Sequence, residues 1–306
     1  MKAVKILLKR NIKLFFKDKG MFFTSLITPV ILLILFITFL GNVYKNSFVS
    51  AFEGMDVADN VINGLVAGQL FSSLLAVCCV TVSFCSNMIM VQDKVTGAYK
   101  DLMITPLKKS TLAISYYIST LINTLIICLL ATLASFVYMA SCGWFLTFKD
   151  VVFIFLDVFL LVIFGTALSS IINSFLSTQG QISAVGTIVS SCYGFLCGAY
   201  MPISNFSKTL QNVLAFLPGT YGTSLLRNHA MQGAISQLSQ YNLPDTALLA
   251  VQDVTDCNIY FFDHLVSMRT MYFILVITDI LLIVIYILFN VYQSKHHRKQ
   301  QKSQNN

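Results

Sequence analysis

Two aspartates, Asp157 and Asp279, lie inside long apolar stretches of the sequence. Each is about seven to nine residues, or 10–13 Å along a helix, from the outer end predicted for its stretch. A carboxylate at membrane depth is costly, so it usually faces a bundle interior or a water-filled path. The two side chains could line a path for cationic or polar cargo, or they could hydrogen-bond to a neighbouring helix.

No catalytic or metal-binding motif accompanies these carboxylates. The histidines are predicted to lie outside the spans, two externally and two in the C-terminal tail: His229, His264, His296 and His297. The eight cysteines form no CxxC pair, although Cys142 and Cys257 could both lie outside and pair. Without a GxxxxGK[ST] motif the chain cannot hydrolyse ATP through a P-loop, so we do not expect an enzyme.

A charged stretch, residues 92–110, separates two long apolar runs and carries four lysines and two aspartates. Within it Val95, Tyr99 and Leu102 recur at helical spacing, and Pro106 would end the helix that they predict. A short amphipathic helix across the ends of two membrane helices could receive a push from a soluble partner. A solvated connector is the alternative interpretation.

The composition is typical of a membrane protein. Of 306 residues, 56% are hydrophobic and only 11% are charged, and the mean hydropathy is +0.75. Soluble domains are about one quarter charged. We therefore predict an all-α membrane protein with one transmembrane domain, residues 1–293, and a basic tail, residues 294–306. Six runs are long enough to span the hydrocarbon core: residues 21–41, 63–91, 112–139, 151–173, 183–201 and 271–293.

The charge distribution predicts the orientation. Residues 1–19, 92–111 and 294–306 hold fifteen of the twenty Lys and Arg residues, whereas eight of the thirteen acidic residues lie in the loops between them. Basic residues concentrate in cytoplasmic segments, so both termini are expected on the cytoplasmic side of a bacterial plasma membrane.

The first nineteen residues predict an amphipathic helix lying on the inner leaflet. Its basic face would carry Lys2, Lys5, Lys9, Arg10, Lys13 and Lys17, and its apolar face Val4, Leu7, Leu8, Ile12, Leu14 and Phe15. A helix of this kind binds anionic membrane lipid.

Small residues recur every four positions in the fifth predicted span: Gly186, Ser190, Gly194 and Gly198. Such a stripe lets another helix approach closely, either in a dimer or within the same subunit. The next segment, residues 202–270, is predicted to be external. An amphipathic helix bracketed by Pro202 and Pro218 would lie in the outer interface or re-enter the membrane part way, and residues 237–264 would form a cap.

Two motifs of the sequence resemble those of the membrane subunit of an ABC-2 type ATP-binding-cassette exporter. The first is an acidic–basic–x–x–Gly pattern with a later Leu and a small residue before Pro, here Asp93, Lys94, Gly97, Leu102, Thr105 and Pro106. The second follows the fifth span, here Gly198, Pro202, Leu217, Pro218, Tyr221 and Arg227. After Pro106 the family often has Gly-Lys, whereas this chain has Ser115-Tyr116-Tyr117.

The resemblance implies a dimer of such subunits, or a pair with a related permease, above two separate ATPase subunits that hold ATP and magnesium. This chain itself would hold no cofactor and bind no nucleic acid. Residues Asp93–Pro106 would be the coupling helix, and the cargo would be a drug, an antibiotic peptide, a lipid or a glycan moved outward. An ion-coupled carrier or a channel is the alternative.

Overall fold

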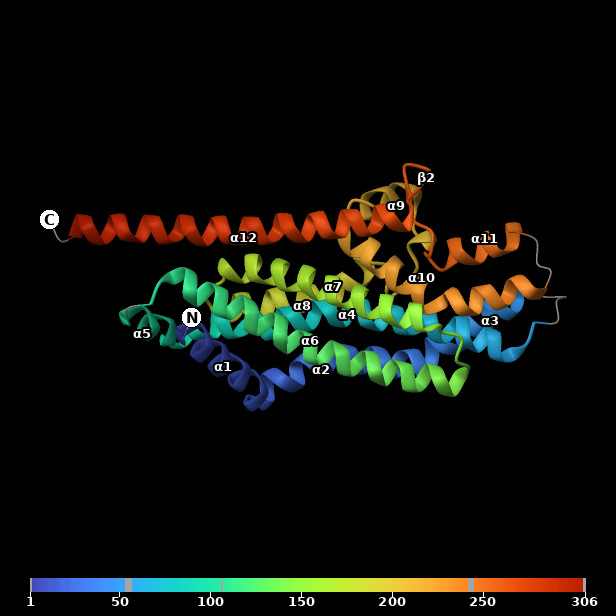
Figure 1. The fold of residues 1–306 in the computed structure, drawn as a ribbon, viewed down its shortest axis with the longest axis horizontal. Helices are drawn as coiled ribbons and strands as arrows, with labels where there is room; N and C mark the ends of the chain where they lie inside the picture. Colours follow the sequence, from blue (N-terminus) through green and yellow to red (C-terminus); the bar gives the residue numbers. More distant parts are fainter. Residues whose placement is uncertain (1, 53–56, 106, 242–244, 305–306) are drawn as a thin grey trace.

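The computed structural model describes residues 2–52, 57–105, 107–241 and 245–304, with side chains omitted for residues 51, 245 and 293–304. Pro106, the predicted helix stop, therefore lies outside the described residues. The elements are almost all helical (Figure 1). In chain order they are α1 Lys2–Lys17, α2 Lys19–Leu35, the π-helical turn η1 Phe36–Leu40, α3 Gly41–Ala51, α4 Asp59–Thr96, α5 Ala98–Ile104, α6 Lys109–Cys142, α7 Phe148–Ser174, α8 Gln179–Leu196, η2 Ile203–Asn205, α9 Lys208–Leu214, α10 Pro218–Leu238, η3 Ser239–Tyr241, α11 Asp245–Val254, β1 Tyr260–Phe261, β2 His264–Leu265 and α12 Met268–Gln304.

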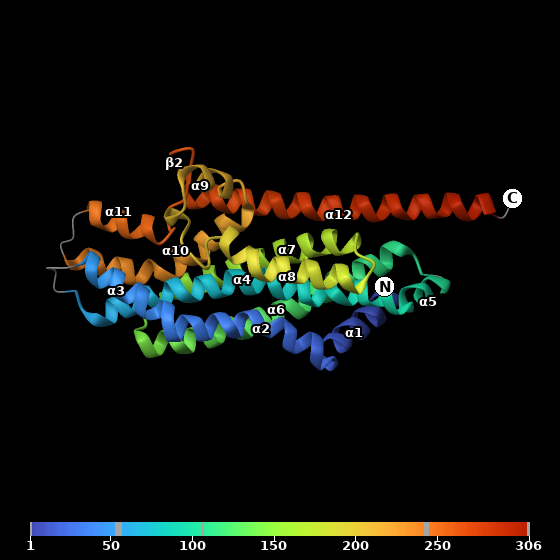
Figure 2. The ribbon, with the colours of Figure 1, turned by 180° about the vertical axis from the view of Figure 1, so that it is seen from behind.

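Helix α4 lies at the centre of the bundle, with α6, α7, α10, α2 and α8 packed around it (Figures 1 and 2). Its most apolar stretch is 94% buried, against 17% for that of α12. Glycines allow the closest approaches: a Cβ on Gly68 would lie 2.8 Å from the Ala230 carbonyl oxygen, and one on Gly165 would lie 2.8 Å from that of Cys79. Such close backbone contact is how membrane helices pack without a hydrophobic driving force between them.

Five helical segments of the described chain are long and apolar enough to cross a membrane: Lys19–Ser50, Asp59–Thr96, Lys109–Cys142, Phe148–Ser174 and Met268–Tyr292. The prediction of an all-α membrane protein is confirmed, and these segments contain five of the six predicted spans. The remaining prediction, residues 183–201, corresponds to α8, which is not among the five and already ends at Leu196.

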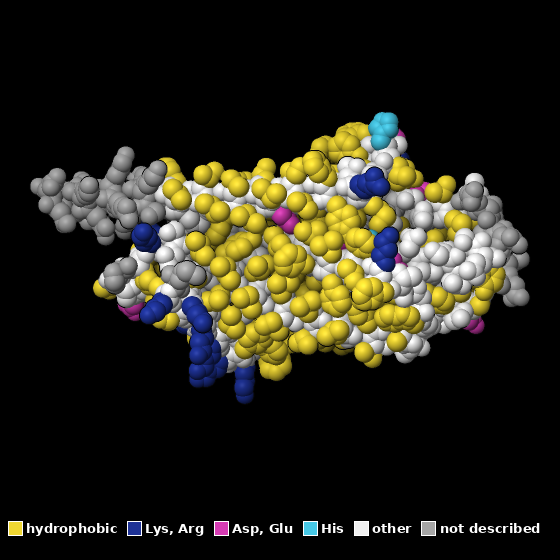
Figure 3. Space-filling model, in the orientation of Figure 1, with side chains coloured by type: hydrophobic (Ala, Val, Ile, Leu, Met, Phe, Trp, Pro, Cys, Tyr) yellow, Lys and Arg dark blue, Asp and Glu magenta, His cyan; other side chains and the backbone are white. Residues whose placement is uncertain are grey.

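Helix α1 has the predicted amphipathic form. Leu7, Asn11 and Phe15 are buried against the bundle, and its lysines are exposed. Two residues depart from the prediction: Arg10 turns toward α4 instead of joining the lysines, and Leu14 is exposed. Figure 3 shows Lys and Arg side chains gathered at the end of the molecule that carries α1 and α5, beside a broad hydrophobic face.

The prediction for the segment before α12 needs correction. The expected helix between Pro202 and Pro218 is replaced by the short η2 and α9. The long helix is α10, which begins at Pro218 because proline needs no hydrogen-bond acceptor at a helix start. It is largely buried and packs against α4, α7 and α12. The described part of residues 237–264 folds as the end of α10, η3, α11, β1 and the first residue of β2.

Candidate functional site

The predicted coupling segment is two helices joined at Gly97. This residue has φ +86°, in the left-handed region that glycine adopts without strain, and it ends α4 and begins α5. Val95 therefore belongs to the last turn of α4, whereas Tyr99 and Leu102 belong to α5. The expected single stripe of apolar residues is thus divided between two helices.

Asp93 is buried at the end of α4 and binds two other helices. Arg10 of α1 donates two hydrogen bonds to its carboxylate, Nη1 to Oδ2 at 2.7 Å and Nη2 to Oδ1 at 2.9 Å. The Tyr116 hydroxyl of α6 donates to Oδ2 at 2.5 Å. The hydrogen bond with Asp93 raises the pKa of Arg10. Tyr116 was not among the predicted site residues. It belongs to the Ser-Tyr-Tyr sequence that departs from the family pattern, and this departure could have indicated its role.

Lys94 points into its own subunit, toward α7. Its Nζ donates to the carbonyl oxygens of Ser174 at 2.8 Å, Leu176 at 3.0 Å and Asn173 at 3.3 Å. These carbonyls lie at the C-terminal end of α7, where a cation satisfies acceptors that the helix leaves free. Lys100 and Asp101 of α5, by contrast, are exposed.

The apolar residues of α5 divide into two groups. Tyr99 and Leu102 are half-buried and pack against the protein's own cluster around Leu7 and Phe15. Ile104, by contrast, has 84% of its surface exposed.

At the ends of this segment, Val95 is exposed beside α5. Thr105 is also exposed, and its hydroxyl donates to the Leu102 carbonyl at 2.5 Å. Val95 and Ile104 are therefore more exposed than Tyr99 and Leu102, which are half-buried.

The small residues of the fifth predicted span partly pack inside the subunit. A Cβ on Gly194 would lie 2.3 Å from the ring of Tyr200, and one on Gly186 would lie 3.0 Å from Met88 Cε. Gly198 lies beyond the end of α8, so the helical stripe does not reach it. Ser190 faces a groove, and its carbonyl accepts a hydrogen bond from the Tyr200 hydroxyl at 2.9 Å.

This groove has a volume of about 1190 Å³ and opens beside the first membrane-spanning segment. Its walls are α2, η1 and α3 on one side, with α8, residues 200–205 and α11 on the other. None of its lining residues in the described part of the chain is charged. The groove therefore suits the apolar part of a molecule better than a charged group.

Asp157 does not line this groove. It is fully buried on α7, and both of its oxygens are occupied: Oδ2 by His229 Nδ1 at 2.6 Å, and Oδ1 by the Tyr272 hydroxyl at 2.5 Å. Asp157 thus forms a contact between helices, as in the alternative interpretation, and its place in a cargo path stays a prediction. His229 was expected outside the spans, but it lies on the buried helix α10.

Asp279 on α12 is different. It is buried, yet neither carboxylate oxygen has a hydrogen-bond partner among the described residues. The hydroxyl of Tyr117 on α6 is likewise unpartnered within that part of the chain, and the two groups interact electrostatically. The structure therefore leaves Asp279, unlike Asp157, with free acceptors.

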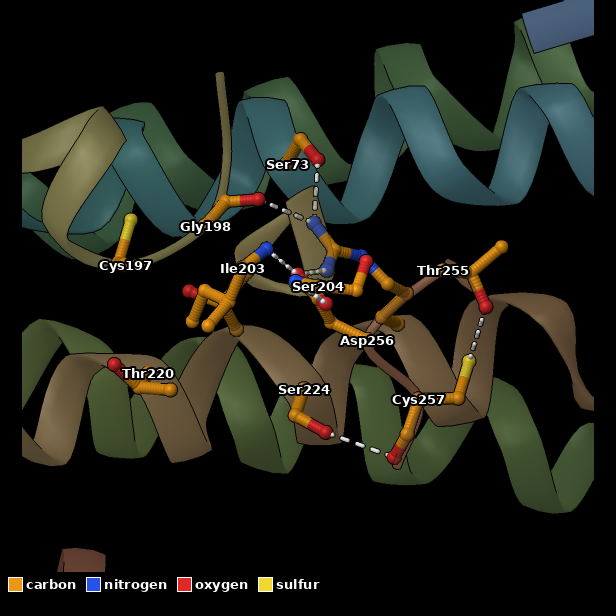
Figure 4. A network of polar contacts seen from close by, with 12 residues as sticks. Ser73, Cys197, Gly198, Ile203, Ser204, Thr220, Ser224, Thr255, Asp256 and Cys257 are labelled. Carbon is orange, nitrogen blue, oxygen red and sulfur yellow. Dashed lines mark hydrogen bonds and ion pairs between the residues drawn. The ribbon is translucent and has the colours of Figure 1, made fainter. Parts of the chain in front are cut away.

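At the opposite end of α4, a network of buried groups is built around Arg227 of α10 (Figure 4). Its guanidinium reaches three segments: Nη1 contacts Asp256 Oδ2 at 3.2 Å, and Nη2 donates to Ser73 Oγ at 3.0 Å and to the Gly198 carbonyl at 2.9 Å. Only 1% of the Arg227 side chain is exposed. Arg227 and Gly198 belong to the family pattern, whereas no sequence signal marked Ser73 or Asp256.

Asp256 completes this network by holding the backbone after α8. It accepts hydrogen bonds from the backbone N–H of Ile203 at 2.5 Å and of Ser204 at 3.1 Å. Burial raises the pKa of Asp256, while Arg227 and the two N–H donors oppose that rise. Gly198 has φ +73°, and a Cβ there would lie 2.8 Å from Ile203 Cγ1 and 3.1 Å from Asp256 Oδ2.

The other predicted residues of this segment support α10. Pro202 is buried before η2, and Leu217 precedes the first residue of α10, Pro218. Tyr221 is buried in the first turn of α10, and its hydroxyl donates to the Ala215 carbonyl at 2.5 Å.

Cys142 and Cys257, which could have paired, form no disulfide: both are free thiols. Over the described residues, no group of three or more His, Cys, Asp or Glu side chains could hold a metal ion.

Comparison with known proteins identifies the family. The sequence model of the ABC-2 type transporter family matches residues 2–230. No curated protein and no solved structure matches the chain. The family match covers most of the chain, including the charged segment after α4 and the buried Arg227 of α10. The chain is therefore a member of the ABC-2 type transporter family.

Proposed function

We propose that this chain is the permease subunit of an ATP-driven exporter. A separate ATPase subunit would hold ATP and magnesium, and the cargo would be an amphiphile such as a drug, an antibiotic peptide, a lipid or a glycan, moved outward across the plasma membrane. The observation that carries the proposal is the position of α5. It presents exposed Ile104 at the charged end of the molecule, and a single residue, Gly97, joins it to the most buried span, α4.

The contacts at the end of α4 give a route for mechanical coupling. A push on α5 would reach the last turn of α4 through Gly97. There Asp93 is bonded to α1 and α6, and Lys94 is bonded to the end of α7. In this proposal Asp93 and Lys94 transmit movement among the subunit's own helices, whereas Ile104 and Val95 contact the ATPase. Apolar anchors of this kind contribute most of the affinity at a helix-in-groove contact.

The groove supports the proposed class of cargo. Its uncharged lining suits the apolar part of an amphiphile. Ser190 lines this groove, so a second permease copy or a related permease placed against α8 would close over it. The predicted dimer contact then rests on the groove-facing side of α8, because Gly194 is covered by Tyr200.

An ion-coupled carrier is the second candidate, and one residue favours it. Asp279 is buried with both oxygens unpartnered among the described residues, as a cation- or proton-binding carboxylate in a carrier would be. The two candidates differ in their energy source. Export by the carrier would continue without an ATPase and would stop when the ion gradient is dissipated.

The deciding experiment combines copurification with an export assay. Ile104→Asp should lower ATPase capture by about 5- to 150-fold, and export with it, if Ile104 is an anchor worth about 1–3 kcal/mol. Phe148→Asp is the matched control, because Phe148 is 85% exposed and lies at the other end of the bundle. Leu102→Asp would be less informative, since Leu102 also packs against its own subunit. Full capture and export by Ile104→Asp would show that α5 is only a connector.

A further inference from the structure

Three polar side chains from three helices meet in the interior: Asp157 of α7, His229 of α10 and Tyr272 of α12. Asp157 Oδ1 accepts a hydrogen bond from the Tyr272 hydroxyl at 2.5 Å, and Asp157 Oδ2 lies 2.6 Å from His229 Nδ1, within hydrogen-bonding distance. The imidazole is further held by Phe153, whose ring is stacked on it at 4.9 Å and 8°. The position of the ring is therefore fixed on two sides, and α10 is linked to both neighbouring helices.

The contact between Asp157 and His229 relates the net charge of the cluster to the number of hydrogens that it binds. The 2.6 Å contact requires one hydrogen between Asp157 Oδ2 and His229 Nδ1, and when the carboxyl group is ionised this hydrogen lies on Nδ1. With a neutral imidazole the cluster has a net charge of −1. When Nε2 takes a proton from water, a new N–H bond forms and the imidazolium balances the carboxylate. A net charge in a buried, weakly polar environment is costly, whereas a hydrogen-bonded pair of opposite charges is tolerated.

Among the described residues, the charged groups on the surrounding helices do not compensate the negative charge of Asp157. On α10, Arg227 is engaged by Asp256. On α7, Lys149 Nζ lies 5.8 Å from the centroid of the Phe153 ring and forms no described contact with Asp157.

Two further helices face α10. On α12, Arg269 is exposed. On α4, Gly68 packs against α10, and Ser73 reaches Arg227. Within the described part of the chain, His229 is thus the group whose protonation can neutralise Asp157. Its side chain is 8% exposed, which leaves a route for exchange of the proton with water.

We propose that Asp157 and His229 form a proton-binding site whose occupancy sets how firmly α10 is held between α7 and α12. With the proton bound, an ion pair joins α7 to α10. Without it, a buried uncompensated carboxylate weakens the same contact. The strength of this contact therefore depends on pH, and the inference does not depend on what the protein transports.

The test is the thermal unfolding temperature of the purified full chain between pH 5 and pH 9. A purification tag without histidine is used. The wild type should unfold at a higher temperature at the acid end, by about 3 °C or more, because the bound proton stabilises the folded state. His229→Gln keeps an N–H donor without titrating, and Asp157→Asn removes the charge. Both should flatten this difference, whereas the exposed histidine variant His264→Gln should retain it.

A second measurement needs no variant of the cluster. Hydrogen exchange of the wild type, corrected for the intrinsic effect of pH, should show α10 more protected at pH 5 than at pH 9, with α4 as the internal reference. The proposal is overturned if α10 follows α4 at both values. It is equally overturned if His229→Gln keeps the wild-type pH profile, which would make the cluster a fixed structural contact.

Discussion

Arg10 and Asp93, which are 83 positions apart in the chain, form a two-point ion pair with N–O distances of 2.7 and 2.9 Å. This contact fastens the amphipathic helix α1 to the end of the most buried helix, next to the segment proposed to meet the ATPase. A helix predicted to lie passively on the membrane surface is thus bonded to the central helix of the bundle.

The first prediction concerns this pair. Arg10→Met should lower the free energy of unfolding by about 1–3 kcal/mol, because among the described residues it leaves Asp93 with only Tyr116 as a side-chain partner. Arg10 is 30% exposed, so water partly compensates the loss. Denaturant unfolding in detergent measures the effect, with Lys9→Met as the exposed control. In a double-mutant cycle with Asp93→Asn, additive effects would show that the ion pair contributes nothing.

A larger effect is expected at Arg227 and Asp256, because both are almost completely buried. Asp256→Asn alone should destabilise the protein by about 3–5 kcal/mol, since it leaves the Arg227 guanidinium without a counter-charge. Combining it with Arg227→Met should recover part of that loss. Thermal unfolding of the three variants measures the coupling. A double variant that loses the sum of the two single effects would contradict the proposed pairing.

Gly194→Leu tests whether the small residues of α8 pack within one subunit. The new side chain would displace the Tyr200 ring, so the stability of the isolated monomer should fall by about 1–3 kcal/mol. Gly180→Leu is the control, because a Cβ on Gly180 has no neighbour within 4 Å. Unfolding of the monomer in detergent is the measurement. An unchanged monomer with a lost dimer would instead place Gly194 at a contact between subunits.

The orientation predicted from the basic residues is tested by cysteine labelling. A cysteine at Lys100 in α5 should react with an impermeant reagent only after the cells are permeabilised. A cysteine at Lys208 in α9 should react in intact cells. Both positions are exposed, and the background requires replacement of the exposed native Cys192 by serine. Labelling of position 100 in intact cells would reverse the topology.

Local features of the sequence were sufficient to predict most of the helices. Apolar runs of span length predict membrane helices because the bilayer core requires them, and five such segments are present. Lys5 and Lys9 on one face and Leu7 and Phe15 on the other likewise predict the amphipathic helix α1. Both faces can be recognised from residues that are close together in the sequence. The family motif includes Gly97, but a single helix was predicted there, whereas the structure has the α4–α5 junction at this residue.

Which polar side chains meet depends on the tertiary structure. Lys94 was placed in a charged stretch and His229 in an external segment, whereas in the structure Lys94 caps α7 and His229 contacts Asp157. The partner of Arg227, Asp256, lies in a loop 29 positions further along the chain. Such pairs depend on the rotation and register of packed helices. Hydrophobicity carries little information on either, because lipid and the protein interior are similarly apolar.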